Sequence, residues 1–297
     1  MKILLSVSVL LFLLSCGGSQ KAQEPSKSSL PAELEDLSNE DFKPKRQVRY
    51  NAKADYHIID DLVQDALKDE SLAKIDHGDI KKIDKKISGI SGLCYLGHSK
   101  EGLQKLDTIY PKYKSNPSYW NQMGSCYLEL GKIRKAKIFY NKALSLNNKY
   151  TPAINNLGVV YLREGKPEKS LAAFKQVVKL RRNSKTAKYN MSSLFLKFGL
   201  FNKAEKLLNE VYKSGGKDKD VMLALAYSQL YRGNGQAAIR YLSKIPSEIL
   251  RTKDFSLALF YAYKITKNKK STKISDFLEG QDLSKKQRIA FNRMRQL

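Results

Sequence analysis

Five glycines recur at one constant interval along the chain, without slippage: Gly97, Gly131, Gly165, Gly199 and Gly233. A fixed period of roughly 20–50 residues is the signature of a solenoid, in which each repeat packs mainly against its neighbours. Stacked repeats present a long surface to solvent rather than a deep pocket. The period therefore predicts a protein that works by holding another chain on a surface.

The residues around each glycine have the spacing of helix pairs. Before Gly131, the residues Trp120, Met123, Gly124 and Tyr127 occupy positions i, i+3, i+4 and i+7, which lie on one face of a helix. The glycine is expected at positive φ, where it ends one helix before the next begins. In the second helix a small residue is followed four positions later by a larger one: Ala136 and Tyr140, Ser170 and Phe174, Ala204 and Leu208, Ala238 and Leu242.

These units resemble tetratricopeptide repeats. The stretch from Trp120 to Tyr140 matches that motif nearly completely, and the next unit is similar, with Ile154 for the tryptophan and Ser170 for the alanine. The usual junction proline is replaced in this chain. The resemblance covers roughly residues 83–266 and implies an all-α superhelical solenoid of about five to six helix pairs with capping helices. It also implies a protein-binding function rather than an enzymatic one.

Residues 1–15 have the pattern of a secretory signal peptide. A basic start precedes an apolar run from Ile3 to Leu14, which is too short to span a bilayer. The sequence ending at Cys16 resembles a bacterial lipobox, which implies that Cys16 is diacylated; the alternative is an ordinary cleaved signal. In bacterial lipoproteins, an aspartate directly after the cysteine tends to retain the protein at the inner membrane. Gly17 stands there in this chain, so the same resemblance implies a location at the outer membrane. We expect a lipid-anchored envelope protein that faces the periplasm or the exterior.

The rest of the chain divides by composition. Residues 16–50 are rich in Ser, Pro, Lys and Glu, and predict a disordered tether behind the lipidated cysteine. Residues 51–82 are expected to form N-terminal capping helices, with an amphipathic helix near 58–67. Residues 267–297 are expected to form basic C-terminal capping helices. For the last of these, 283–297, a helix lying on a membrane is the alternative.

Charge and reactive residues exclude several functions. The net charge of +25 would suggest nucleic acid in a cytosolic protein, but the export signal argues against that partner. The lysines of the second helices are interpreted as a solvated face, or alternatively as a surface that attracts anionic glycan or lipid. The histidines His57, His77 and His98 lack ligand spacing, so we expect no enzyme, cofactor or metal. Cys94 and Cys126 are interpreted as two buried small residues, with a disulfide as the alternative.

Amide side chains recur on the side of each first helix that lies opposite its core stripe, the expected concave side. Gln122, Asn156 and Asn190 occupy the same position in successive repeats. Because amides both donate and accept, they suit the backbone of an extended peptide; the alternative is that they bond the neighbouring helix. Tyrosines further along are expected to anchor the partner's apolar end. The candidate groove residues are Asn121, Gln122, Asn155, Asn156, Tyr189, Asn190, Tyr227 and Tyr231.

Together these features predict a membrane-anchored adaptor that binds a partner chain in its concave groove. The expected partner is a protein or extended peptide segment of an envelope complex, and the lipid supplies the membrane contact. Lipoproteins that resemble this chain serve as pilotins for type IV pilus secretins, as motility-complex parts and as docking factors for cell-wall enzymes. The alternative function is a module whose basic convex face binds anionic glycan or lipid.

Overall fold

The structure is a computed structural model that describes residues 74–78 and 83–297. The described part contains fourteen helices and no strand. The predicted signal peptide, Cys16, the tether and the stretch 58–67 lie outside the described residues. Within the predicted capping segment 51–82, the described residues 74–78 are not helical, which corrects the prediction at that point.

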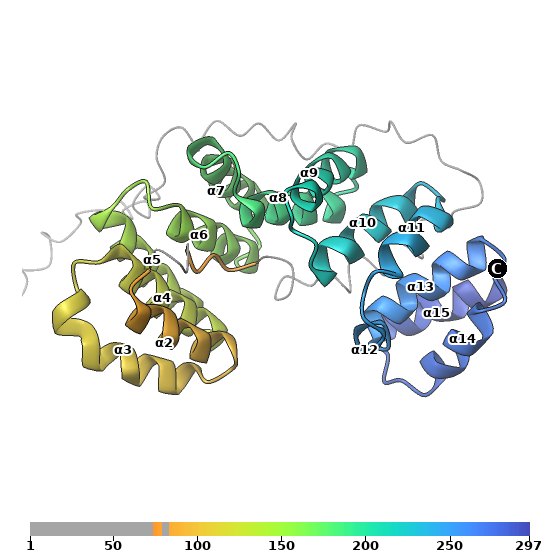
Figure 1. The fold of residues 1–297 in the computed structure, drawn as a ribbon, viewed down its shortest axis with the longest axis horizontal. Coiled ribbons are helices and arrows are strands. Elements are labelled where there is room, and N and C mark those ends of the chain that lie inside the picture. The colour runs from red at the N-terminus through yellow and green to blue at the C-terminus, as the bar shows by residue number, and fades with distance from the viewer. Residues whose placement is uncertain (1–73, 79–82) are drawn as a thin grey trace, which may run out of the picture. The chain divides into compact units, whose positions relative to one another are not determined.

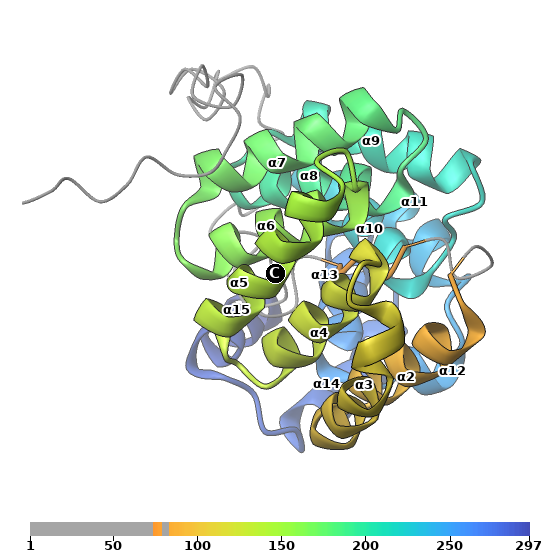
Figure 2. The ribbon, with the colours of Figure 1, turned by 90° about the vertical axis from the view of Figure 1, so that its left-hand side faces the viewer.

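The helices pack in consecutive pairs, and Figures 1 and 2 show the two helices of each pair side by side. The second helix of one pair then contacts the first helix of the next. This order confirms the all-α tetratricopeptide solenoid. The pairs are α2 (Lys85–Tyr95) with α3 (Ser99–Tyr113), α4 (Pro117–Glu129) with α5 (Ile133–Leu146), α6 (Thr151–Arg163) with α7 (Pro167–Leu180), α8 (Lys185–Lys197) with α9 (Phe201–Lys213), and α10 (Lys219–Tyr231) with α11 (Gly235–Leu242).

The C-terminal helices continue the stack. The short helix α12 (Ser247–Leu250) leads into α13 (Lys253–Ile265), which packs on α11. Both α14 (Ser271–Glu279) and α15 (Lys285–Gln296) then pack on α13. Phe291 of α15 is buried against Phe260 of α13, with 5.3 Å between the ring centroids. The apolar face of α15 is therefore covered, as expected of an end cap.

The periodic glycines end the first helices as the sequence predicts. All five have positive φ, between 69° and 89°. At Gly131 the turn is closed by two backbone bonds: Gly131 N–H donates to the Leu128 carbonyl at 3.0 Å, and Lys132 N–H donates to the Tyr127 carbonyl at 2.8 Å. This pair of bonds is the Schellman arrangement, in which glycine avoids the cost of a side chain at positive φ.

Two glycines inside the first helices make room for large aromatic rings of the second helices. A Cβ at Gly124 would come within 2.7 Å of the Tyr140 ring, and one at Gly158 within 2.5 Å of the Phe174 ring. Both rings are fully buried. At the equivalent positions of the next two units, a smaller second-helix residue occurs together with a larger first-helix one: Leu208 with Ser192, and Leu242 with Ala226.

Cys94 of α2 and Cys126 of α4 form a disulfide, with 5.0 Å between their Cα atoms. This finding corrects the interpretation of the two residues as unpaired, although both are buried as expected. The physical reason lies in α3, where Gly102 stands one repeat before Ala136, at the equivalent position. A Cβ at Gly102 would collide with the Cys94 Sγ, so the glycine opens the space that this sulfur fills.

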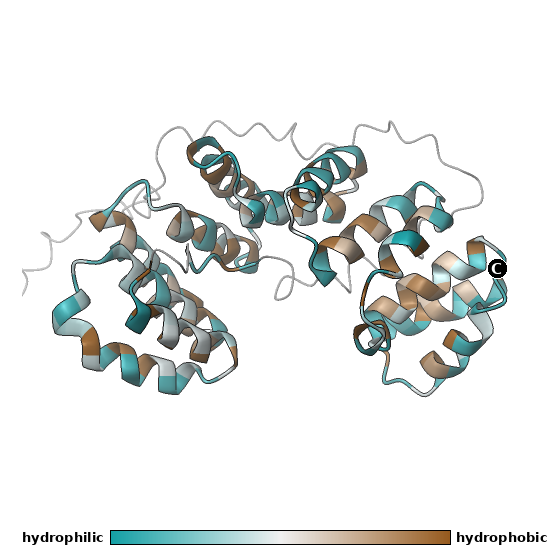
Figure 3. Ribbon diagram, in the orientation of Figure 1, coloured by the Kyte–Doolittle hydropathy of each residue, from teal (hydrophilic) through white to brown (hydrophobic). Residues whose placement is uncertain are grey.

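Figure 3 shows hydrophobic and hydrophilic residues on the same helices, as expected for amphipathic elements. Throughout 74–78 and 83–297, no helix combines the length and apolar character needed to cross a bilayer. The basic residues of the second helices are largely exposed, including Lys132, Lys135 and Lys169. Lys166 is also exposed and pairs with Glu164 at 2.7 Å. These exposed cations carry much of the positive charge of the repeats.

Candidate functional site

A short segment of the chain itself lies on the predicted binding residues. Residues 74–78, which we call the cis segment, contact α8, α6 and α4 in that order (Figure 1). The cis segment is bound by amide side chains that we call the ladder: Asn121, Gln122, Asn155, Asn156 and Asn190. All five ladder residues are almost fully buried, at no more than 1% exposure.

Two successive rungs of the ladder bind the cis segment in the same way. Asn156 accepts the Asp76 N–H at 2.7 Å and donates to the Asp76 carbonyl at 2.9 Å. One repeat later, Asn190 accepts the Lys74 N–H at 2.7 Å and donates to the Lys74 carbonyl at 3.0 Å. Asn156 and Asn190 are one repeat apart, and the residues that they bind, Asp76 and Lys74, are two positions apart in the segment.

The remaining asparagines support this arrangement. Asn121 donates to the Asp76 carbonyl at 3.1 Å, and Asn155 donates to the Lys74 carbonyl at 3.0 Å. The rungs are also joined to each other, because Asn156 donates to Asn121 Oδ1 and Asn190 donates to Asn155 Oδ1, both at 3.0 Å. These bonds fix each amide in the orientation that presents both a donor and an acceptor to the segment.

Gln122 forms the third rung with a different geometry. Its Nε2 donates to the His77 carbonyl at 2.9 Å, which leaves its Oε1 as an acceptor. The His77 Nδ1 lies 3.0 Å from that Oε1, so in this arrangement Nδ1 carries the proton. The His77 ring also packs edge-on against Tyr95 of α2, with 5.9 Å between centroids. This rung therefore holds a side chain of the segment as well as its backbone.

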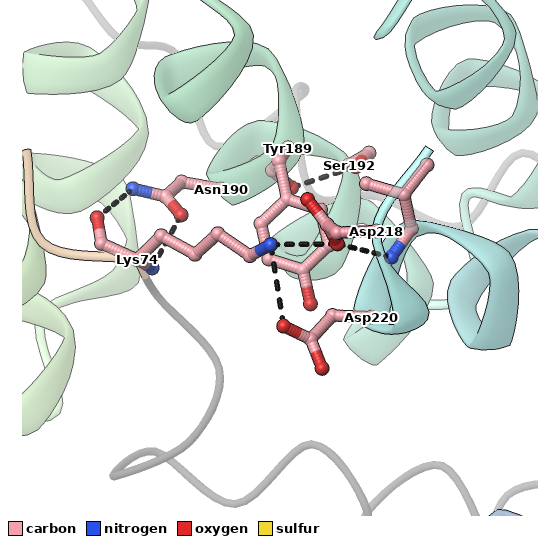
Figure 4. A network of polar contacts seen from close by, with 7 residues as sticks. Lys74, Tyr189, Asn190, Ser192, Asp218 and Asp220 are labelled. Atoms are coloured by element: carbon pink, nitrogen blue, oxygen red, sulfur yellow. Dashed lines mark hydrogen bonds and ion pairs between the residues drawn. The ribbon is translucent and has the colours of Figure 1, made fainter. Parts of the chain in front are cut away.

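The other end of the cis segment brings a cation to a cluster of residues that we call the pocket: the carboxylates of Asp218 and Asp220 and the ring of Tyr189 (Figure 4). Lys74 Nζ lies 2.8 Å from Asp218 Oδ1 and 3.2 Å from Asp220 Oδ2, at the start of α10. The same ammonium lies 4.5 Å from the centroid of the Tyr189 ring. Burial raises the pKa of Tyr189, and the carboxylates of Asp220 and Asp218 raise it further. Tyr189 therefore stays neutral, and its ring presents a π face to the ammonium.

The predicted groove residues divide into two groups. The ladder and Tyr189 come together around the cis segment, whereas Tyr227 and Tyr231 are buried, each at 1% exposure. Tyr231 stacks on Phe201 of α9, with 3.6 Å between ring centroids. Both rings are thus covered in this structure, and their role as anchors for a partner stays a prediction.

The sequence suggested that the amides bind either a partner peptide or the neighbouring helix. In the structure the ladder amides bond to the cis segment and to one another, which differs from both interpretations. A peptide backbone does lie on the amides, but it belongs to the same chain; binding of a separate partner stays a prediction. Sequence reasoning missed the cis segment and both acidic residues of the pocket. One signal was present, because Asp218 stands where an N-cap residue is expected and accepts the Val221 N–H at 3.1 Å.

Comparison with known proteins supports the fold. The tetratricopeptide repeat family model matches residues 117–150 and 151–184, which contain α4 to α7. No curated protein matches the chain in sequence. Solved structures do match, and they include a tetratricopeptide repeat protein from Parabacteroides merdae at 17% identity and a TM-score of 0.51, covering 72% of this chain and 87% of that one.

Two further neighbours have names connected with pili. PilW, described as a widely conserved type IV pilus biogenesis factor, is 18% identical with a TM-score of 0.57, over 69% of this chain and 96% of PilW. PilF of Pseudomonas aeruginosa is 12% identical with a TM-score of 0.60, over 72% of this chain and 96% of PilF. At these identities the likeness shows the fold alone. The tetratricopeptide fold is typically a non-enzymatic scaffold for protein interactions.

Proposed function

We propose that this protein is a membrane-anchored scaffold that holds a segment of a partner protein on the ladder and so assists assembly of an envelope machine. The observation that carries the proposal is the repeated pair of bonds from Asn156 and Asn190 to a peptide backbone. Buried amides that bind alternate residues of a backbone form a surface suited to peptide recognition.

The disulfide supports a location outside the cytoplasm. Disulfides persist in oxidising compartments such as the bacterial periplasm and the cell surface, and are rare in the cytosol. The Cys94–Cys126 bond is therefore consistent with export through the signal at residues 1–15. The outer membrane, reached through a lipid on Cys16, is the location that we propose.

The lipid anchor is tested at Cys16. We expect Cys16→Ser to abolish labelling by a fatty-acid analogue and to leave the signal peptide uncleaved, because the acyl chains need the thiol. The usual triacyl group anchors a protein stably in a membrane, so the variant should also lose this lipid attachment to the membrane. Labelling of the variant at the wild-type level, measured by in-gel fluorescence, would reject the anchor. Cys94→Ala/Cys126→Ala is the control, since it removes the other cysteines and should keep the label.

The names of PilW and PilF suggest which machine to examine first. We propose that the envelope machine is a type IV pilus secretin or a motility complex. The reason is that the structural match spans almost the full length of PilW and of PilF. A docking factor for cell-wall enzymes would use the same ladder. The exposed cations of the second helices favour a second candidate function, attachment to anionic glycan or lipid.

A pull-down from envelope extracts tests the scaffold function and separates the two candidates. We expect Asn156→Ala/Asn190→Ala to lose partner capture, because it removes both bidentate rungs. The control Lys135→Glu/Lys169→Glu changes the exposed basic face and should keep capture. The reverse result, with capture lost only in the lysine variant, would move the function to the basic face. High salt adds a second discrimination, because it screens contacts between exposed charges more strongly than buried amide bonds.

A further inference from the structure

The rungs at Asn156 and Asn190 bind backbone atoms and therefore do not select a sequence. Both rungs at Asn156 and Asn190 contact only the N–H and C=O groups of the segment. Any residue other than proline offers the same groups. At this end of the ladder, selectivity has to come from side-chain contacts beside the rungs.

The pocket that holds the Lys74 ammonium supplies such contacts. The ladder stops beyond Asn190, because the equivalent position of the next repeat is Ala224. Beside this position, the carboxylates of Asp218 and Asp220 and the ring of Tyr189 all contact the Lys74 ammonium. A negative charge would be repelled at this point, whereas an ammonium or guanidinium gains charge-assisted bonds and a ring contact.

The pocket remains open enough to exchange its occupant. The Lys74 side chain is 29% exposed, and the side chains of Asp218 and Asp220 are 49% and 40% exposed. The backbone rungs are buried, but the cationic end is reached from solvent. An incoming peptide can therefore engage the carboxylates before the rungs are released.

We propose that the cis segment is a built-in competitor, and that the partner is an extended segment with a lysine or arginine that takes the place of Lys74. This rests on the proposed function, since it names the chemistry of the segment that the scaffold would hold. An occupant on the same chain has an effective concentration on the order of millimolar. The partner must therefore match its contacts, and a basic residue at the pocket supplies the selective one.

A labelled peptide with the sequence of residues 72–80 tests the exchange by fluorescence anisotropy. The wild-type chain should bind it weakly. Lys74→Ala/Asp76→Pro removes the ammonium and one N–H from the cis segment, and should bind the peptide at least about ten-fold more tightly. The same peptide with norleucine in place of lysine should bind that variant about five-fold more weakly, and adding Asp218→Asn/Asp220→Asn should remove the difference between the two peptides.

Wild-type protein provides a second measurement that does not depend on the variant folding. Excess unlabelled peptide should accelerate hydrogen exchange at the amides of Lys74 and Asp76, and the norleucine peptide should do so less. Unchanged exchange at saturating peptide would show that the cis segment is a permanent part of the fold, and would overturn the proposal.

Equal binding of the lysine and norleucine peptides by the emptied variant would likewise reject the cationic pocket. The scaffold function fails separately: it is rejected if Asn156→Ala/Asn190→Ala leaves capture of the partner intact in the pull-down. Capture that is lost in that variant but unaffected by Asp218→Asn/Asp220→Asn would keep the scaffold and remove only the inference about the basic residue.

Discussion

Replacing Cys94 and Cys126 by alanine is expected to lower the free energy of unfolding around α2 to α4 by about 3–4 kcal/mol. The disulfide joins residues 32 apart in sequence, and a closed loop of that length removes substantial entropy from the unfolded chain. The expected loss is large for one helix pair, because each repeat gains stability mainly from its neighbours. In the variant, α2 and α3 should unfold before the rest of the solenoid.

The chain carries its own local probe for this experiment. Trp120 is the single tryptophan of the sequence and lies in α4, the helix that contains Cys126. Urea unfolding followed by tryptophan fluorescence should shift to lower concentration in Cys94→Ala/Cys126→Ala. The far-UV circular dichroism, which averages over all helices, should shift less.

A reductant supplies the matched control. Once the wild-type protein is unfolded and refolded with dithiothreitol, its fluorescence transition should approach that of the double alanine variant, and the variant itself should not respond. A wild-type transition that is unchanged by complete reduction would contradict the stabilising role. Because a solenoid need not unfold in one step, the comparison uses the fluorescence midpoint rather than a global stability.

The repeat pattern of the sequence was sufficient to predict the helix pairs and their turns. The reason is physical, since a residue such as Gly131 at positive φ and a packed pair such as Gly124 and Tyr140 act within one repeat. Local chemistry then recurs in each repeat and can be read without knowing the fold in detail. The ladder was predictable for the same reason, because Gln122, Asn156 and Asn190 occupy equivalent positions.

The occupant of the ladder was not predictable in this way. The cis segment has neither repeat spacing nor helical periodicity, and its bonds join residues 45 to 116 positions apart. The burial of Tyr231 was not predictable for a related reason. A helical wheel places Tyr231 away from the stripe of residues that packs within its own helix pair. The wheel does not show that Tyr231 stacks on Phe201 of the neighbouring pair. Contacts between repeats depend on the stacking, which the wheel omits.

The largest effect at the site is expected from Asn156→Ala. Where water can replace a lost amide, the cost of such a substitution is only about 1 kcal/mol. Asn156 is fully buried, so in the occupied structure the Asp76 N–H and Asn121 Oδ1 would each lose a partner inside the protein, whereas the Asp76 carbonyl would keep its bond from Asn121. Each buried group left unsatisfied costs about 1–3 kcal/mol, which predicts a loss of about 2–4 kcal/mol in docking of the cis segment.

Hydrogen exchange at the Asp76 amide measures this loss directly. A change of about 3 kcal/mol corresponds to a decrease in protection of roughly 100-fold, while amides in α13 should be unaffected. Asn183→Ala is a suitable control, because Asn183 is an exposed asparagine in the turn between α7 and α8. Its exchange pattern should match the wild-type one.

Asn156→Asp distinguishes loss of an amide from loss of volume. Aspartate has nearly the same shape and keeps an oxygen for the Asp76 N–H, but it replaces the donor Nδ2 with a second oxygen. That oxygen would face the Asp76 carbonyl and Asn121 Oδ1, which Nδ2 approaches at 2.9 and 3.0 Å. Because two acceptors repel and a buried charge is costly, Asn156→Asp should release the cis segment at least as fully as Asn156→Ala. Protection of the Asp76 amide at the wild-type level in Asn156→Asp would show that the donor bonds do not hold the segment.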